Sequence, residues 1–353
     1  PSGGLSQADM PRVSVVIPAF NAEQFLRPAL DSVLTQNYDD FDVIVVNDGS
    51  TDGTAAILDE YAAADQRVRV MTQPNQGAAA ANNLAIHATD AELIARMDTD
   101  DISLPGRLRR LVEYLDGHQE AAAVGTGAIL IDGEGRQLAR RIDRTKPSRL
   151  TADAKVGRRN PVMNPTVMFR RQSWLDAGGE RACFIRSHDF DLWVRIAAIA
   201  ELHSLPECLL LYRIHDGNVS YKTVERQALC GLAATRSAEL RRAEQPDPFD
   251  HLQTPISEPD LRAAGCSAER CEEAVLAGIA GQIVFSLLAR QRHRAESLMR
   301  LFEDREKNHA ERLAEYFYRT SAVRLALANR NWAAAVSHGL QLLANRKGAG
   351  TEL

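Results

Sequence analysis

The sequence of 353 residues is poor in cysteine, has no long apolar run and has little excess of charge of either sign. Its five cysteines are scattered and include no C-x-x-C pair, which argues against a disulfide framework and a cysteine zinc site. The longest apolar stretch, 276–289, falls short of the roughly 18 residues that span a bilayer. The net charge of −5 gives no reason to expect a nucleic-acid partner. No signal peptide is evident at the start, so we expect a cytoplasmic protein with reduced thiols.

Two glycine-rich signatures of phosphate binding are also missing. Neither G-x-G-x-x-G nor G-x-x-x-x-G-K-[ST] occurs in the chain, so Rossmann dinucleotide binding and P-loop phosphate binding lose their usual sequence support. A bound nucleotide would then have its phosphates held through a metal. A nucleotidyltransferase is also disfavoured, because Pro18-Ala-Phe-Asn21 is not the glycine-rich basic loop expected after its first strand.

The first hundred residues alternate between short β-branched runs and segments with helical spacing of apolar residues. Such units predict an α/β fold, with a mostly parallel sheet covered by helices on both faces. In these sheets the ligand crevice lies beyond the carboxyl ends of the strands. The predicted strands are 13–17, 41–46, 68–71 and 92–97, and the predicted helices are 23–36, 54–64 and 78–87.

From about residue 107 the alternation loosens and predicts a mixed second half. The proline-rich stretch 245–259 predicts a linker. Beyond it, a composition rich in Ala, Leu, Arg and Glu predicts a helical extension. We therefore expect a first domain followed by a C-terminal helical domain. Further helices are predicted at 108–115 and 191–199, and further strands at 122–131, 137–141, 165–169 and 209–214.

An acidic cluster, Met97-Asp98-Thr-Asp-Asp101, follows the fourth predicted strand. Three carboxylates so close together repel each other unless a cation or hydrogen-bond donors share their field. Hard cations such as Mg²⁺ or Mn²⁺ take oxygen ligands and bridge carboxylates to substrate phosphates. The competing interpretation is a solvated acidic turn. We favour the metal site, because the cluster directly follows a buried strand.

Other polar residues stand at the ends of predicted elements. Asp48 suits hydrogen bonding to a nucleobase, although its segment also caps a helix; a calcium loop is excluded because a strand leads into it. Gly77 lets the backbone approach a ligand closely. Asp189 or Asp191, in the opening turn of a helix, either caps that helix or acts as a base. His215 ends the last predicted strand and is either structural or a ligand.

Seven motifs, in this order, resemble the family 2 glycosyltransferases, which are inverting enzymes of the GT-A fold. The resemblance covers about residues 11–220 and implies a Rossmann-like GT-A domain there. The C-terminal helical domain, over 221–353, would lie outside it. The motifs are Val15-Val-Ile-Pro-Ala-Phe-Asn21, Val45-Val-Asn-Asp-Gly-Ser-Thr-Asp52, Asn75-Gln-Gly77, Asp98-Thr-Asp-Asp101, Asn164-Pro-Thr-Val-Met-Phe-Arg170, His188-Asp-Phe-Asp-Leu-Trp193 and Tyr212-Arg-Ile-His215.

The resemblance implies a role for each matching residue. On the donor side, Phe20 would lie against the nucleotide base, Asp48 would bond it, and Asp98 would face the ribose or the donor sugar. Asp100 would hold Mn²⁺ or Mg²⁺ on the diphosphate, with His215 completing this site. The full set implied for the donor nucleotide is Pro18, Phe20, Asn21, Asp48, Gly77 and Asp98.

On the acceptor side, the resemblance implies that Asp189 is the general base. His188, Asp191 and Trp193 would shape the site around it. Three residues depart from the family pattern. Asn47 stands where many members have Asp, Asn82 stands where many have Arg, and His188 replaces the usual Glu before the base.

The sequence therefore predicts a metal-dependent inverting glycosyltransferase that uses a nucleotide-sugar donor, with a UDP-sugar favoured. The acceptor would be a glycan or a lipid-linked molecule in bacterial surface polysaccharide or glycoconjugate synthesis. The alternative is a non-catalytic module that binds nucleotide sugars or glycans and carries a helical interaction domain. For the extension, solvated helix faces, a homodimer contact and a peripheral contact at the inner face of the membrane all stay open.

Overall fold

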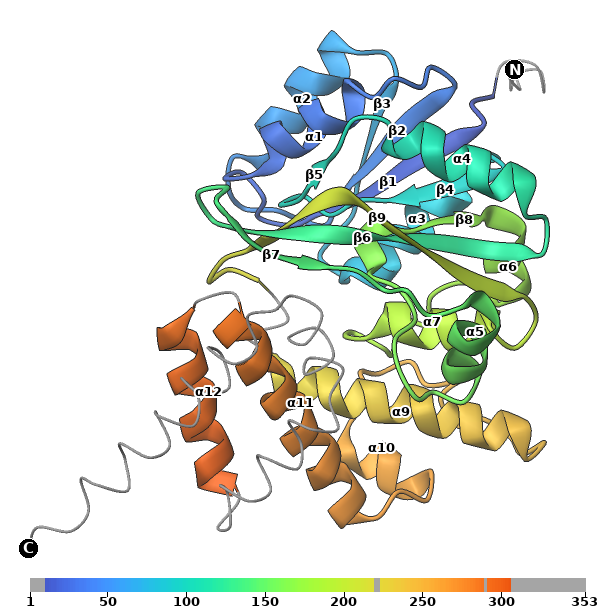
Figure 1. The fold of residues 1–353 in the computed structure, drawn as a ribbon, viewed down its shortest axis with the longest axis vertical. Coiled ribbons are helices and arrows are strands. Elements are labelled where there is room, and N and C mark those ends of the chain that lie inside the picture. The colour runs from blue at the N-terminus through green and yellow to red at the C-terminus, as the bar shows by residue number, and fades with distance from the viewer. Residues whose placement is uncertain (1–9, 219–222, 289–290, 306–353) are drawn as a thin grey trace, which may run out of the picture. The chain divides into compact units, whose positions relative to one another are not determined.

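The structure, a computed structural model, describes residues 10–218, 223–288 and 291–305 (Figure 1). It divides into two compact units. Unit 1 consists of Pro1–Ala128, Ile142–Arg213 and Ala233–Ile256, and unit 2 of Ile129–Arg141, Ile214–Leu232 and Ser257–Leu353. The part of the predicted extension beyond residue 305 lies outside the described residues.

Four parallel strands form the first half of the sheet, as the sequence predicts. They are β1 (Val13–Ala19), β2 (Phe41–Asn47), β3 (Val68–Thr72) and β4 (Leu93–Arg96). β1 pairs with β2 and β4, and β2 pairs with β3. β1, β2 and β4 are buried along almost their whole length, which explains their continuous Val/Ile-rich sequences.

Antiparallel strands complete the sheet. β8 (Met168–Arg170) pairs antiparallel with both β4 and β6 (Ala121–Asp132), and β5 (Ile102–Ser103) pairs antiparallel with β9 (Glu201–Ile214). The strand order in the described part of the chain is β3-β2-β1-β4-β8-β6-β9-β5. β7 (Gln137–Arg141) pairs with β6 outside this path. The carboxyl ends of β1, β2 and β4 lie at the same edge because these strands are parallel.

Helices cover both faces of the parallel strands (Figure 1). Alternate residues of β1 point to opposite faces: Val15 belongs to the hydrophobic cluster that includes α1, α2 and α4, and Val16 to the cluster that includes α3, α6 and α7. The helices of unit 1 up to residue 196 are α1 (Leu26–Leu34), α2 (Thr54–Ala64), α3 (Ala78–His87), α4 (Arg107–Gly117), α5 (Pro147–Lys155), α6 (Arg171–Asp176) and α7 (His188–Ile196), with a 3₁₀ turn at Asn164–Thr166.

The remaining described helices are α9 (Val224–Arg242), α10 (Glu258–Ala263), α11 (Ala268–Leu288) and α12 (Arg292–Arg305). Within unit 2, α11 and α12 share a small apolar core centred on Ile279 and Phe302, both fully buried. None of the described helices is long and apolar enough to cross a membrane.

The proline-rich stretch is not wholly exposed. Its residues up to Ile256 belong to unit 1. Phe249 is 1% exposed, and its ring packs edge-on against Phe184 with 6.1 Å between centroids. The predicted domain boundary at residue 220 and the linker over 245–259 stay predictions.

Candidate active site

The acidic turn after β4 is held in place by the end of β9. The backbone N–H of Arg213 donates to Oδ1 of Asp101 at 2.9 Å, and its guanidinium donates to the carbonyl oxygen of Asp100 at 2.8 Å. Asp101 is fully buried, and its Oδ2 has no hydrogen-bond partner. The predicted cluster is therefore a rigid, partly buried turn and not a solvated loop.

Negative charge accumulates in this turn. Burial and the neighbouring Asp100 carboxylate raise the pKa of Asp98 to about 6. Burial, followed by the charges of Asp100 and Asp98, also raises the pKa of Asp101 well above its usual range. A cation bound here would relieve the repulsion. Among the described residues no three His, Cys, Asp or Glu side chains are grouped so as to hold a metal ion.

The base-binding residue predicted after β2, Asp48, is almost fully buried and accepts three hydrogen bonds. Its Oδ1 accepts from Gln73 Nε2 at 2.7 Å and from the N–H of Gln76 at 2.8 Å, and its Oδ2 accepts from the N–H of Gly77 at 2.8 Å. A carboxylate offers about four acceptor positions, so one remains for a ligand N–H. Gly77 has a φ of +88°, and a Cβ there would meet open space.

The loops after β1 and β2 are tied together. Asn21, at φ +48°, accepts a hydrogen bond from the N–H of Thr51 on its Oδ1 at 2.8 Å, and its own N–H donates to Ser50 Oγ at 3.0 Å. Pro18 lies on β1, one residue before its end. Phe20, just after β1, is 49% exposed and presents its ring to solvent. An aromatic face held beside a crevice can stack on a planar ligand.

Asp189 lies in the first turn of α7, where its Oδ2 accepts a hydrogen bond from Asn160 Nδ2 at 3.0 Å. The preceding Ser187 has a φ of +53°, an uncommon conformation for a residue with a side chain. The negative charge of Asp189 acts to raise the pKa of Asp98, and the nearby His188 acts to lower it. The fold thus brings the start of α7 and the acidic turn together.

Asp191 and Trp193, which were expected to shape the acceptor side, lie inside the fold. Both are fully buried. Asp191 is paired with Arg181 and Arg195, and although burial acts to raise its pKa, these two arginines hold it below the usual value. Trp193 packs edge-on against Phe169 at 5.7 Å. Both side chains therefore support α7 from within the fold, and their part on the acceptor side stays a prediction.

His215 belongs to unit 2 and the acidic turn to unit 1. Its backbone N–H donates to Asn218 Oδ1 at 2.7 Å, and its Nδ1 accepts from the N–H of Gly217 at 3.2 Å. Its assignment to the metal stays a prediction.

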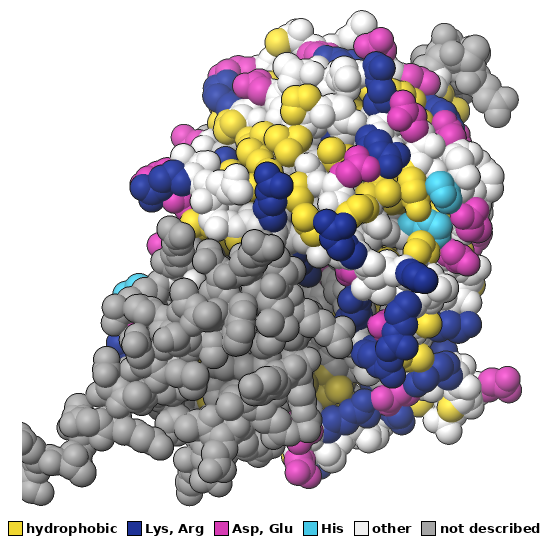
Figure 2. Space-filling view, viewed as in Figure 1, with side chains coloured by type: hydrophobic (Ala, Val, Ile, Leu, Met, Phe, Trp, Pro, Cys, Tyr) yellow, Lys and Arg dark blue, Asp and Glu magenta, His cyan; other side chains and the backbone are white. Residues whose placement is uncertain are grey.

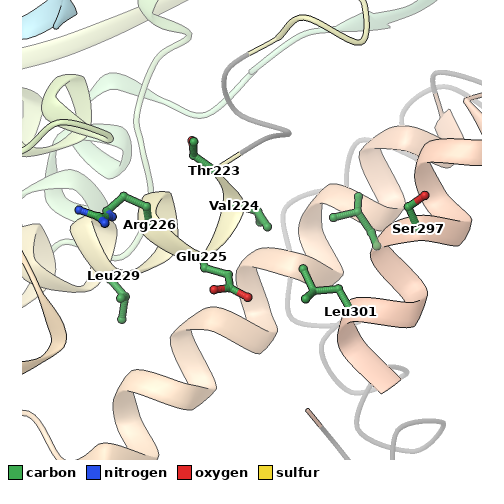
Figure 3. A pocket seen from close by; sticks show the side chains of 8 residues that line it. Thr223, Val224, Glu225, Arg226, Leu229, Ser297 and Leu301 are labelled. Atoms are coloured by element: carbon green, nitrogen blue, oxygen red, sulfur yellow. The ribbon is translucent and has the colours of Figure 1, made fainter. Parts of the chain in front are cut away.

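Unit 2 contains a cavity of about 600 Å³ between the start of α9 and α12 (Figure 3). None of the predicted site residues lines it. Its walls are formed by Thr223, Val224, Glu225, Arg226, Leu229, Ser297, Leu298 and Leu301.

Comparison with known proteins identifies the family. Residues 14–179 match the family model for glycosyl transferase family 2. The O-antigen biosynthesis glycosyltransferase WbnJ of Escherichia coli is 32% identical over 221 residues, an alignment that covers 62% of this chain and 83% of that protein. The chain belongs to glycosyltransferase family 2. The expected family, and with it an enzyme of the glycosyltransferase class, is confirmed.

Two solved structures share the fold of this glycosyltransferase. The mannosyltransferase PcManGT from Pyrobaculum calidifontis, in complex with GDP-Man and Mn²⁺, superposes with a TM-score of 0.53 at 18% identity, covering 89% of this chain and 86% of that one. TarS 1–349 of S. aureus, in complex with UDP-GlcNAc, gives a TM-score of 0.52 at 17% identity, covering 83% and 90%. The expected GT-A fold is confirmed.

Several polar residues around the site of this family member could not be recognised from the sequence motifs. Asn160 and Glu180 lie between the recognised motifs, and Arg213 was noted only as part of one. Arg96 was the detectable signal, because an arginine inside a buried apolar strand needs a counter-charge. Its partner, Glu180, is 84 residues away, and nothing in the local sequence points to it.

Proposed function

We propose that the chain is a metal-dependent, inverting glycosyltransferase, in which Asp98–Asp101 serve the donor and Asp189 serves the acceptor. The observation that carries this proposal is the proximity of the two groups. Glu180 links the two segments. Its carboxylate bonds Arg96, two residues before the acidic turn, at 3.2 Å. The same carboxylate lies 3.7 Å from His188, the neighbour of Asp189. A donor sugar bound at the turn would then lie within reach of a base on α7.

The carboxylates at the end of β4 fit a divalent cation. They are oxygen donors, they repel one another, and Asp101 Oδ2 is buried without a partner. Mg²⁺ is commonly bound through one or two carboxylates together with substrate phosphates. Asp100 is the proposed ligand, and diphosphate oxygens and water would complete the coordination. When bound, the metal would supply charge stabilisation for the departing nucleoside diphosphate.

Side chains of the site have the remaining roles in the reaction. Phe20 stacks on the base, and the free acceptor position of Asp48 takes a base N–H. Asn160 orients the Asp189 carboxylate, which removes the proton from the acceptor hydroxyl as it attacks the anomeric carbon. A single displacement, with the base and the leaving group on opposite sides of the sugar, inverts that carbon.

The donor is proposed to be a nucleotide sugar, with a UDP-sugar favoured, in line with the UDP-GlcNAc bound by TarS. The GDP-mannose bound by PcManGT makes GDP the second nucleotide to test. The acceptor is proposed to be a glycan or a lipid-linked molecule of a bacterial surface polysaccharide, because the relative WbnJ acts in O-antigen biosynthesis. A homodimer stays a prediction.

A peripheral membrane contact is proposed for the surface around α5. Residues 144–159 contain six Lys or Arg and one Asp in a chain of net charge −5, and Figure 2 shows basic side chains gathered over α5 and the loop before it. Arg144, Lys146 and Lys155 are exposed. Ile199 is one of two large hydrophobic side chains that are exposed in the described residues. It lies near α5 in the chain's path, because Leu202, three residues later, donates a backbone hydrogen bond to Thr151 of α5. Basic residues beside an exposed apolar one suit an anionic bilayer surface.

The test of the catalytic proposal combines binding with turnover. Thermal shifts are measured with UDP, GDP, dTDP and CMP, each with Mn²⁺ or EDTA, and then nucleotide release is followed from the sugar donors of the nucleotide that binds. A ligand at 100 times its Kd stabilises by about 2.7 kcal/mol, which is readily visible. A shift for one nucleotide that needs metal, followed by transfer, is expected. Binding without turnover by any donor would favour the non-catalytic module.

A further inference from the structure

The carboxylate of Glu180 is the meeting point of two residues that depart from the family pattern. Asn82 Nδ2 donates to Oε2 of Glu180 at 2.9 Å. His188 Nε2 lies 3.7 Å from the same oxygen. Asn82 stands where many members have Arg, and His188 stands where Glu is usual. Both departures therefore converge on one carboxylate that lies outside all seven motifs.

The third partner of this carboxylate is Arg96, whose NH1 donates to Oε1 of Glu180 at 3.2 Å. The two side chains are 1% and 2% exposed. A guanidinium so far from water requires a nearby anion, because an unpaired buried charge is strongly destabilising. With His at residue 188, the carboxylate usual at that position is missing, and Glu180 supplies one to Arg96.

The backbone of Glu180 is fixed by its surroundings. Its N–H donates to Asn83 Oδ1 at 3.0 Å, and its carbonyl oxygen accepts from Asn83 Nδ2 at 2.7 Å. Gly179 before it has a φ of +70°, and a Cβ there would come within 2.9 Å of Trp174. The turn therefore aims the carboxylate at Arg96 and leaves it little freedom to move.

We propose that Glu180 supplies the buried counter-charge of Arg96 in place of a carboxylate at residue 188, where the family pattern has Glu. It is a positioning residue: it holds Arg96, two residues before Asp98 on the donor side, and His188, immediately before Asp189 on the acceptor side. This inference rests on the proposed function, because the two segments matter for turnover only if Asp98 and Asp189 act on donor and acceptor. It adds a residue that links the two halves of the site.

The experiment tests whether a carboxylate at residue 188 can replace the carboxylate of Glu180. Glu180→Gln, His188→Glu and the double variant are made in the full chain, and melting temperature, kcat and KM for nucleotide release are measured. Glu180→Gln is expected to lower the melting temperature by about 5–10 °C, since Arg96 loses the carboxylate to which it is hydrogen-bonded. Its kcat is expected to fall at least about tenfold. His188→Glu alone is also expected to lower both the melting temperature and kcat, because two carboxylates then share one guanidinium.

The double variant decides the question. It restores one carboxylate, at residue 188, and is expected to recover most of the melting temperature and of kcat. Glu207→Gln is the matched control, because Glu207 pairs with Arg110 at the surface, at 2.8 Å. It is expected to change neither quantity appreciably.

Several results would overturn the proposal. One is a double variant no better than Glu180→Gln, and another is a double variant that regains its melting temperature without kcat. If Glu180→Gln does not fold, the double variant Arg96→Met/Glu180→Gln replaces it, because it removes both buried charges. This variant is expected to fold and to have a low kcat. A full kcat would show that the pair of Arg96 and Glu180 is only structural. If the wild type releases no nucleotide, the proposed function fails, while the melting temperatures still decide where the carboxylate belongs.

Discussion

The side-chain amide of Asn160 donates a hydrogen bond to Oδ2 of Asp189, across 3.0 Å. Asn160 lies in the loop that follows α5, and Asp189 in the first turn of α7. The bond engages Oδ2, which leaves Oδ1 for the acceptor hydroxyl in the proposed reaction. In that reaction the amide would select which oxygen faces the acceptor.

Replacing Asp189 by Asn is expected to lower kcat by about 10²–10⁴-fold, the usual contribution of a general base. Asn keeps the size of the side chain and its contact with Asn160, so donor binding should persist. The measurement is kcat for transfer, alongside the Kd of the nucleotide with Mn²⁺. Loss of nucleotide binding together with turnover would assign Asp189 to the donor site instead.

Asn160→Ala is expected to lower kcat about tenfold, because the carboxylate loses the partner that orients it. Asn160→Asp is the sharper variant, since it places a second carboxylate against Asp189 and should be slower than Asn160→Ala. Both are read from kcat and KM at saturating donor. Equal rates for the Ala and Asp variants would show that the amide donor is not important.

Asp98→Asn is expected to raise stability while it removes activity. Because the pKa of Asp98 in the folded protein, about 6, lies above its ordinary value, the folded state holds this proton to higher pH than the unfolded chain. Stability is therefore lost as pH rises from about 4 to about 6. Removing the charge should return about 1–2 kcal/mol at pH 7.5. Calorimetry in EDTA at pH 4 and pH 7.5 should show this gain only at the higher pH.

Asp191→Asn is expected to cost about 3 kcal/mol, because Arg181 and Arg195 would lose a buried counter-charge. The pKa of Asp191 is lowered by folding, so its contribution is present above the unfolded pKa and disappears as pH falls through the folded one. Urea titrations at pH 7 and pH 3 should therefore show a smaller difference at pH 3. Asp90→Asn, which breaks an exposed pair with Arg171, is the control and should have almost no effect.

Much of the fold could be predicted because its signals are local. The helix over Ala78–His87 and the strand over Gln137–Arg141 have the predicted bounds. Other helices and strands begin at residues that differ from the predicted ones, for identifiable reasons. α7 begins at His188, three residues early, because its polar first turn lacks apolar periodicity. β9 begins at Glu201, eight residues before the predicted start, because Pro206 and the polar residues near it interrupt the apolar pattern of a strand.

The site was only partly predictable. Motifs at the ends of strands and the starts of helices are the signals that predicted Asp98 and Asp189 as site residues, because the crevice of such a sheet lies beyond the carboxyl ends of its strands. The partners of these residues come from far along the chain, such as Arg213 for Asp101 and Asn160 for Asp189. The environment of Asp191 could not be predicted for the same reason. Its two arginines, and hence its burial, become visible only once the chain is folded.

The basic surface around α5 leads to a test on vesicles. A variant with Arg144, Lys146 and Lys155 changed to Gln is expected to bind anionic phosphatidylglycerol vesicles about 100-fold more weakly, at about 1 kcal/mol for each lost charge. Changing Arg27, Arg69 and Arg109 to Gln removes the same charge from other exposed positions and should leave binding unchanged. Neutral vesicles should bind neither protein, and raised salt should weaken the wild type. Equal losses in both variants would mean that net charge alone drives binding, and that α5 has no special part in it.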